Sequence, residues 1–245
     1  MMSNIKSGHP ILIKLSGELL LISPDTHSKE NKSPRNRLDA VSKQIKKLSE
    51  NHHLGIVIGG GNFFRGGQHG KAIGSTSKVG HTVGMMATIM NGLLLKDIFE
   101  QNEIEVSLLS SIEIPGIVEI VSQDKIEHAK QNNQVIIFVG GTGKPFFTTD
   151  TAAVLRAKEI GSKVVFKATQ VDGVYSSDPK KNNSARKIDQ ISCEETIRLG
   201  LKIVDASALT MAEENGISIR VFAQDQEDSI LRAASDPAFG STIVP

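Results

Sequence analysis

The chain has 245 residues, of which 39% are hydrophobic and 22% charged, a composition typical of a globular protein with one large or two small domains. Its 28 basic and 27 acidic residues leave a net charge of +1, which argues against general binding to nucleic acid or to a membrane surface. With no Trp and one Tyr, the chain also lacks the residues of an aromatic stacking platform for single-stranded nucleic acid.

Short apolar runs alternate along the chain with amphipathic stretches. The predicted strands are 11–15, 55–58, 106–109, 118–121, 135–139, 164–166 and 219–222. The predicted helices are 37–51, 82–101, 205–215 and one that opens at the capping box Ser192-x-x-Glu195. Two polar stretches, 23–36 and 176–187, are expected to be exposed loops. The alternation predicts an α/β fold with a mostly parallel central sheet that helices cover on both faces.

The N-terminal apolar run, 11–20, is interrupted by Lys14 and Glu18, which neither a signal peptide nor a membrane span tolerates well. No stretch approaches the about 18 apolar residues of a membrane span. The lone cysteine, Cys193, cannot form an internal disulfide, and the acidic residues beside it make it a poor nucleophile. We therefore expect a cytoplasmic protein.

Three segments rich in Gly or Thr follow predicted strands, at 14–17, 59–67 and 140–150. Ligands of parallel α/β proteins bind beyond the carboxyl ends of the strands, which is where these segments fall. Glycine lets the backbone approach phosphate closely, and phosphoryl transfer depends on cations and N–H groups around the moving group. Walker A, dinucleotide and protein-kinase fingerprints are all absent, so any bound nucleotide requires another loop design.

The first two segments each offer one cation. Lys14 ends an apolar strand, where its ammonium group would either meet phosphates at the end of the sheet or extend to solvent from an edge strand. Arg65 follows three consecutive glycines and could reach an anion with two hydrogen bonds. The alternative for this second segment is a flexible surface turn.

The third segment leads into a helix. Thr149 or Asp150 is expected to cap that helix. A cap alone does not account for the preceding Gly-Gly-Thr-Gly run or for two phenylalanines in a loop. Exposed Phe146 and Phe147 would suit either a base pocket or a contact between subunits.

Five motifs in register resemble those of bacterial UMP kinases of the amino acid kinase superfamily, and the resemblance covers about residues 11–244. They are Lys14-Leu15-Ser16-Gly17-Glu18, the stretch 57–66, Gly84-Met85-Met86-Ala87-Thr88, the stretch 141–150 and the stretch 167–179. The resemblance implies a three-layer α/β/α sandwich, a homohexamer, and phosphoryl transfer from ATP to UMP in pyrimidine nucleotide biosynthesis. It implies a single domain, in which about residues 1–160 bind the acceptor and about residues 161–245 bind ATP.

The resemblance also implies roles for individual residues. The implied ATP-binding residues are Lys14, Leu15, Ser16, Gly17, Gly61, Arg65, Thr169, Tyr175 and Asp178. The implied UMP-binding residues are Gly60, Thr142, Gly143, Lys144, Pro145, Phe146, Phe147, Thr148 and Thr149. Lys14 would stabilise the moving phosphoryl group, and Asp150 would orient the lysines of the active site. No general base is required, because the UMP phosphate is already an anionic nucleophile. Mg²⁺ would arrive with ATP, held by ATP oxygens and water rather than by a protein metal site.

Two positions depart from the family pattern. His81 stands where the family has an Asp that binds UMP, so a fixed negative charge is missing. Loss of one charge-assisted hydrogen bond is worth about 1.5–3 kcal/mol, or roughly 10- to 150-fold in affinity. Lys144 replaces the usual Asn and adds a cation beside the expected UMP phosphate. We therefore expect Lys144 to offset part of the loss.

Regulation is expected to differ from that of some relatives. The polar stretch 23–36 replaces the glycine-rich stretch found in relatives that GTP activates, which argues against GTP activation here. The resemblance implies UTP as an inhibitor that competes at the UMP site. Sequence leaves open whether Lys163 or Lys167 is a second catalytic lysine, and Asp205 is expected to be a helix N-cap.

Two other functions stay open. A kinase of the same superfamily that phosphorylates a carboxylate or a carbamate would share the lysine and glycine loops, although the run 145–149 favours UMP. A non-catalytic oligomer that binds nucleotide is the second, with His69 and His81 as candidate metal ligands.

Overall fold

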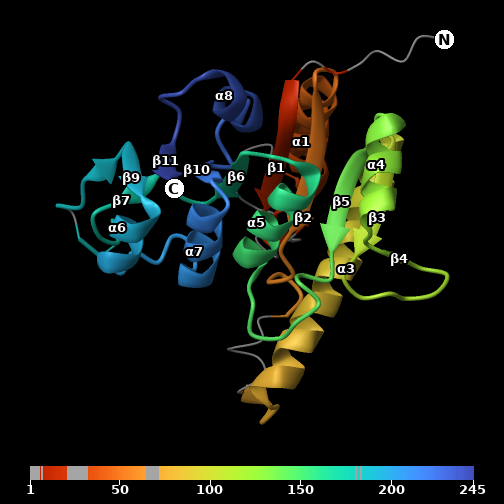
Figure 1. Ribbon diagram of the computed structural model, residues 1–245, viewed down its shortest axis with the longest axis horizontal. Coiled ribbons are helices and arrows are strands. Elements are labelled where there is room, and N and C mark those ends of the chain that lie inside the picture. The colour runs from red at the N-terminus through yellow and green to blue at the C-terminus, as the bar shows by residue number, and fades with distance from the viewer. Residues whose placement is uncertain (1–5, 7, 21–32, 65–71, 180, 183) are drawn as a thin grey trace.

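A computed structural model of the chain describes residues 6, 8–20, 33–64, 72–179, 181–182 and 184–245. Its centre is a nine-stranded sheet in the order β4-β3-β5-β2-β1-β6-β10-β11-β9. Among the described strands of this sheet, neighbours run parallel except β10 and β11. Figure 1 shows helices on both faces of the sheet. The predicted α/β fold with a mostly parallel sheet is confirmed.

The strands are β1 (Gly8–Leu15), β2 (His52–Ile58), β3 (Val106–Ser110), β4 (Glu119–Ile120), β5 (Val135–Val139), β6 (Val164–Thr169), β7 (Val174–Tyr175), β8 (Lys187–Ile188), β9 (Gln190–Ser192), β10 (Ser218–Ala223) and β11 (Ser241–Val244). The helices are the 3-10 helix η1 (Gly17–Leu20), α1 (Pro34–Ser49), α3 (Ser77–Gln101), α4 (Gln123–Gln131), α5 (Thr149–Ile160), α6 (Cys193–Arg198), α7 (Ala206–Glu214) and α8 (Ser229–Ser235). Strands β7 and β8 form a separate antiparallel pair.

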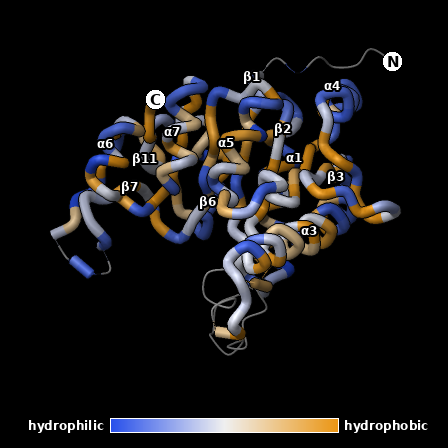
Figure 2. The backbone as a smooth tube through the Cα atoms, turned by 60° about the horizontal axis from the view of Figure 1, so that its bottom comes forward, coloured by the Kyte–Doolittle hydropathy of each residue, from blue (hydrophilic) through white to orange (hydrophobic). Residues whose placement is uncertain are grey.

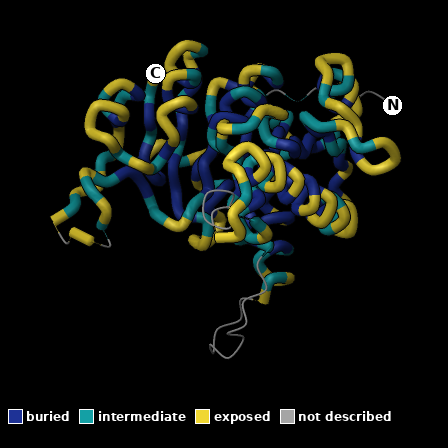
Figure 3. Tube along the Cα trace, turned by 90° about the horizontal axis from the view of Figure 1, so that it is seen from below, coloured by how far each residue is buried: buried dark blue, intermediate teal, exposed yellow. Residues whose placement is uncertain are grey.

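Both faces of the central strands are buried. In β1, Ile11, Ile13 and Leu15 pack in one core with α1, α3 and α8. Leu12 faces the other way, into a second core with α5 and α7. In a parallel sheet covered on both sides, strands are apolar at consecutive positions rather than at every second one. This explains why all residues of 11–15 except Lys14 are apolar. Figure 3 shows the buried strands inside and the exposed turns around them.

Helices α1 and α5 start differently from the sequence prediction. The polar stretch 23–36 was extended too far, because Ser33 caps α1 by accepting the Asn36 N–H, and residues 34–36 form its first turn. Residues 23–32 lie outside the described part of the chain. Thr148, and not Thr149 or Asp150, caps α5. Its extended backbone lets its hydroxyl oxygen accept the N–H groups of the two residues after Thr149, as a cap requires.

Short elements escaped the sequence prediction altogether. Helix α4 buries Ile126 and Ala129, too few apolar residues to establish a helical period. The stretch 176–187 was expected to be a loop, but its last residue, Lys187, begins β8 and pairs with Tyr175 of β7. Ser192 caps α6 as predicted, accepting the Glu195 N–H, and Asp205 occupies the N-cap position of α7 without a hydrogen bond from its side chain.

Helix α3 is 25 residues long, and by length and composition alone it could span a membrane. The sequence prediction that no such stretch exists was therefore wrong. In the structure, 44% of the most apolar part of α3 is buried within the protein. The buried side includes Met85, Ile89, Leu95 and Phe99.

The opposite side of α3 is also apolar, and it faces outward. Six large side chains on it are more than a third exposed, and we call them the α3 stripe: Val79, Val83, Met86, Met90, Leu93 and Leu94. Figure 2 shows hydrophobic residues along this helix at the surface of the molecule. An exposed apolar surface of this length indicates a contact with another molecule.

Cys193 is fully buried at the start of α6. Burial and the nearby Glu213 carboxylate raise the pKa of its thiol to about 11. A thiol with this pKa is protonated at neutral pH and is a poor nucleophile, as the sequence predicted.

Candidate active site

The three glycine- and threonine-rich segments meet at the carboxyl ends of neighbouring strands. Strand β1 lies between β2 and β6, and β2 lies beside β5, so the loops after β1, β2 and β5 are adjacent. The Gly59 N–H donates to the Leu15 carbonyl over 3.1 Å. A Cβ at Gly17 would lie 2.4 Å from the Gly59 carbonyl oxygen, so only glycine fits there. The first two loops are therefore in direct backbone contact.

Lys14 reaches the centre of this region. Its Nζ lies 3.5 Å from Oδ1 of Asp150, which is in the first turn of α5. Lys167 of β6 donates to the other oxygen of the same carboxylate and to the Ile203 carbonyl. Lys14 and Lys167 are register partners on adjacent parallel strands, so both side chains leave the sheet on the same side. We call these three residues the Lys–Asp–Lys network.

The charged groups of the network shift one another's pKa values. Burial alone would raise the pKa of the Asp150 carboxyl, but the charges of Lys167 and Lys14 outweigh it and hold that pKa below its ordinary value. Burial lowers the pKa of Lys167, an effect that Asp150 partly counteracts and Lys14 reinforces. With both lysines charged, one carboxylate leaves a net charge of +1 in the network. Such a centre suits an anionic group.

The β5–α5 loop, residues 140–148, lies at the same end of the sheet. Thr142 holds its turn, because its hydroxyl accepts the Lys144 N–H and donates to the Lys144 carbonyl. Phe146 has φ of 72°, a conformation that costs energy for a residue with a Cβ and that concentrates at functional sites. The remaining predicted residues of this segment lie in the loop or at the start of α5: Gly143, Pro145, Phe147, Thr148 and Thr149.

His81 packs against the loop. Its ring centroid lies 5.0 Å from that of Phe146, with the two rings tilted by 57°. Phe146 and Phe147 remain 64% and 43% exposed, and Lys144 is exposed beside them. The structure thus brings the two positions that depart from the family pattern, His81 and Lys144, to one loop.

Helix α3 is hydrogen-bonded to the loop after β2 and to the β5–α5 loop. Asn91, fully buried, donates to the Gly59 carbonyl over 2.6 Å and exchanges hydrogen bonds with Asn62. The Thr88 hydroxyl accepts the Gly140 N–H over 2.8 Å. Gly60 lies against the helix so closely that a Cβ there would be 2.7 Å from the backbone of α3. Asn62 and Thr88 belong to motifs that carry the family resemblance, but no role was predicted for either, and Asn91 was not singled out from the sequence.

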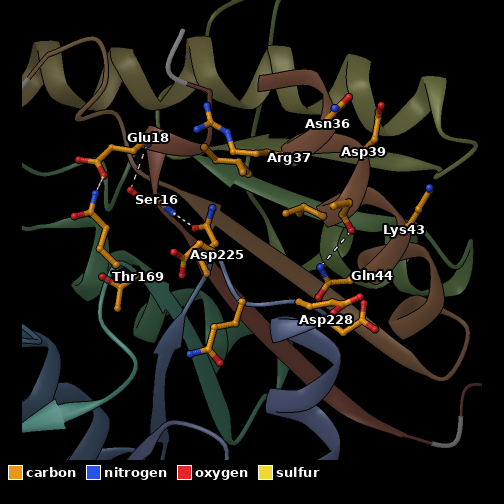
Figure 4. Close-up of a pocket in the computed structure, with 17 residues that line it drawn as sticks. Ser16, Glu18, Asn36, Arg37, Asp39, Lys43, Gln44, Thr169, Asp225 and Asp228 are labelled. Carbon is orange, nitrogen blue, oxygen red and sulfur yellow. Dashed lines mark hydrogen bonds between the residues drawn. The ribbon is translucent and has the colours of Figure 1, made fainter. Parts of the chain in front are cut away.

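A cleft of about 910 Å³ opens beside the loop after β1. Ser16 and Thr169, two of the residues predicted to bind ATP, line it together with residues of α1 and of the β10–α8 loop. Figure 4 shows Glu18 next to them, where it accepts a hydrogen bond from Gln170. The Ser16 N–H faces the side-chain oxygen of Gln224 over 3.4 Å.

The other residues predicted to bind ATP lie around this cleft or beyond it. Tyr175 donates to Asp172 on the β6–β7 segment, and Asp178 follows it. Neither Tyr175 nor Asp178 is among the described residues that line the cleft. Arg65 lies outside the described part of the chain, as does His69. Among the described residues, no group of three or more His, Cys, Asp or Glu is placed to hold a metal ion.

The sequence profile of the amino acid kinase family matches residues 10–223. The uridylate kinase of Thermotoga maritima is 40% identical over 236 residues, which are 96% of this chain and 99% of that protein. The chain belongs to the amino acid kinase family. Two solved structures are similar over 96% of it: UMP kinase from Ureaplasma parvum (TM-score 0.86, 33% identity, 97% of that chain) and from Bacillus anthracis (TM-score 0.87, 32% identity, 95% of that chain).

Within this amino acid kinase, the structure separates two lysines that the sequence left open. Lys167 joins the network, whereas Lys163 is exposed just before β6, at the opposite end of the strand. The signal for Lys167 was available in principle. Like Lys14, it is a lysine near the end of an apolar strand, where burial is costly without a charged partner.

Proposed function

We propose that the chain transfers the γ-phosphoryl group of ATP to UMP, giving ADP and UDP. The observation that carries this proposal is the Lys–Asp–Lys network, which lies between the loop after β1 and the β5–α5 loop. Its net positive charge would stabilise the negative charge of a phosphoryl group in transfer. The acceptor is proposed from the relatives, which are named uridylate kinase and UMP kinase.

In this proposal, each residue of the Lys–Asp–Lys network has its own role. Lys14 touches the moving phosphoryl group, and Asp150 orients Lys14 while Lys167 holds Asp150 in place. UMP attacks through its own phosphate oxygen, so no side chain has to remove a proton. Positioning and charge stabilisation then supply most of the catalysis.

ATP is proposed to bind partly in the cleft that Ser16 and Thr169 line. Its volume of about 910 Å³ is within the range of nucleotide and cofactor sites. The carboxylates of Glu18 and Asp225 in its wall would repel phosphates, so the base and ribose belong in the cleft and the phosphates next to Lys14. Mg²⁺ is proposed to arrive with ATP, because the central carboxylate, Asp150, is already paired with two lysines.

UMP is proposed to bind at the β5–α5 loop, with Gly60 and the segment 142–149 around it. His81 and Phe146 form an aromatic contact beside this loop, where a uracil ring could stack. The first part of the chain, to about residue 160, would then bind the acceptor, and the rest would bind ATP.

Lys144→Asn should raise the KM for UMP roughly 2- to 5-fold, because an exposed cation contributes modestly to binding an anion. Steady-state kinetics with varied UMP would measure this, and Lys158→Asn on the exposed side of α5 is the matched control. An unchanged KM in Lys144→Asn would show that this lysine does not offset the missing Asp.

The acceptor is tested by ATP-consumption assays with UMP, CMP, dUMP and AMP. Selective turnover of UMP is expected, and inactivity on all four would refute the proposal. Phosphorylation of glutamate or aspartate, but not UMP, would instead support a carboxylate kinase. Steady UDP production would count against a non-catalytic oligomer.

Self-association through the α3 stripe is also proposed, with a homohexamer as the final assembly. A second copy laid against the same stripe would bury it symmetrically, and three such pairs make six chains. Pairing would also hold α3, which supports the β2 and β5 loops through Asn91 and Thr88. UTP inhibition at the UMP site, a cytoplasmic location and a role in pyrimidine biosynthesis complete the proposal.

The double variant Met90→Glu/Leu94→Glu should dissociate this assembly, since two carboxylates would be buried at the contact. Light scattering after size-exclusion chromatography should give a mass well below that of a hexamer of 26.4 kDa chains, and turnover should fall with it. Gln131→Glu, on the exposed side of α4, adds the same kind of charge elsewhere and should leave the assembly intact. An unchanged mass in the double variant would exclude the α3 stripe as the contact.

A further inference from the structure

A buried arginine lies behind the β5–α5 loop and takes no part in the Lys–Asp–Lys network. Arg156 of α5 is 3% exposed. Its Nη1 pairs with Glu159, its Nη2 donates to the Ser111 hydroxyl, and its guanidinium lies 5.5 Å from the centre of the Phe138 ring. Its Nε is buried without a hydrogen-bond partner. A buried guanidinium with an unsatisfied donor stabilises a fold poorly, which points to another reason for its presence.

The direction of the hydrogen bonds supplies that reason. A guanidinium group can only donate, so the Ser111 oxygen must accept from Arg156. The single hydroxyl proton of Ser111 is then committed to its other partner, the Gly141 carbonyl, at 2.7 Å. Arg156 thereby fixes the direction in which Ser111 donates.

This bond sets the orientation of one peptide group in the β5–α5 loop. The Gly141–Thr142 peptide is planar and trans, so its N–H points away from its carbonyl. With the carbonyl held by Ser111, the Thr142 N–H faces the opposite side. In the described part of the chain, this N–H makes no hydrogen bond. Gly141 has φ of 57°, and a glycine peptide turns over easily when nothing holds it.

We propose that Arg156 and Ser111 are positioning residues for the acceptor: they hold the Gly141–Thr142 peptide so that the Thr142 N–H donates to a nucleoside monophosphate. The inference rests on the proposed function, because it assigns the β5–α5 loop to the acceptor. If the peptide turned over, a carbonyl dipole would face the anionic acceptor in place of an N–H. Affinity for the acceptor would fall, and affinity for ATP would not.

Ser111→Ala removes the anchor with the least change in shape. It should raise the KM for UMP about tenfold, the effect of one hydrogen bond to a charged group, and leave the KM for ATP within twofold. Arg156→Met should act in the same direction. Because Arg156 acts through Ser111, the double variant should be no worse than Ser111→Ala alone. Ser162→Ala removes another buried hydroxyl, one that bonds to the Val164 backbone, and should leave both KM values unchanged.

Hydrogen exchange of the segment 140–148 supplies a measurement that needs no UMP. Exchange should be faster in Ser111→Ala than in the wild type and unchanged in Ser162→Ala. Equal KM values for UMP in wild type and Ser111→Ala, or equal increases for UMP and ATP, would overturn the inference. If the wild type turns over no UMP, the proposed function fails, and unaltered exchange in Ser111→Ala would then overturn the positioning role separately.

Discussion

Asp150→Asn should lower kcat about 100- to 1,000-fold and destabilise the fold by about 3 kcal/mol. The carboxylate is the shared partner of Lys14 and Lys167, so without its charge Lys14 loses its orientation. The side chains of Lys167 and Asp150 are 9% and 12% exposed, and removing one partner of a buried pair leaves the other charge uncompensated. Steady-state kinetics and denaturant unfolding would measure the two effects.

The loss of stability in Asp150→Asn should depend on pH in a defined direction. Burial already lowers the pKa of Lys167 below 10.5, and loss of Asp150 lowers it further. The unfolded state then binds more protons than the folded state between the folded pKa and 10.5, so the stability of the variant rises with pH through that window. Its deficit relative to the wild type should narrow as pH rises from the folded-state pKa of Lys167 toward 10.5.

At low pH, the wild type should lose the stability that Asp150 contributes. The Asp150 pKa lies below its ordinary value of 3.8, so its contribution to wild-type stability is present above 3.8 and is lost as pH falls through the folded pKa. Asp124→Asn, in the exposed first turn of α4, removes a carboxylate outside the network and should leave kcat unchanged. Wild-type kcat in Asp150→Asn would remove Asp150 from the mechanism.

Lys14→Met should lower kcat about 100- to 1,000-fold while changing stability little. Lys14 is the outer lysine of the network, 3.5 Å from Asp150, and in the proposed mechanism it stabilises the moving phosphoryl group. Lys167 is the inner lysine, held by both Asp150 and the Ile203 carbonyl. Lys167→Met should therefore lose about 3–5 kcal/mol of stability along with activity, because Asp150 loses its nearer partner.

The comparison between these two lysines makes the assignment testable. Phosphoryl-transfer assays and thermal unfolding would be run on Lys14→Met, Lys167→Met and the control Lys163→Met. The control removes an exposed lysine just before the same strand, at the far end from the site, and should behave as the wild type. If Lys14→Met kept its turnover, or if Lys163→Met lost as much, Lys14 would not be the residue that stabilises the moving group.

The sequence by itself determined the fold class and the positions of the loops. Apolar runs such as 135–139 are buried on both faces in the structure, because a covered parallel sheet needs continuous apolar strands. The glycines at 17 and 60 were recognised in loops that follow apolar strands, and the structure shows that a Cβ at either would be too close to neighbouring backbone. These features are local, so the order of residues is enough to reveal them.

Orientation was less accessible to sequence reasoning. The predicted helix 82–101 contains the apolar residues Met86, Met90, Leu93 and Leu94, and the structure places them on the exposed side of α3. A helical period shows that apolar residues share a side, but it does not show whether the sheet or another molecule covers that side. The α3 stripe became visible only when the position of α3 on the sheet was known.

Tertiary structure alone decided which side chains support the site. Lys14 and Lys167 reach the same carboxylate because β1 and β6 are adjacent and in register. These two lysines are 153 positions apart in the sequence, so no local pattern shows that they are neighbours. The bonds from Ser111 to Gly141 and from Thr88 to Gly140 likewise join residues 30 and 52 positions apart. Their physical basis is the packing of separate elements against one sheet. Sequence therefore located the glycine- and threonine-rich loops, and folding selected the side chains that hold those loops in place.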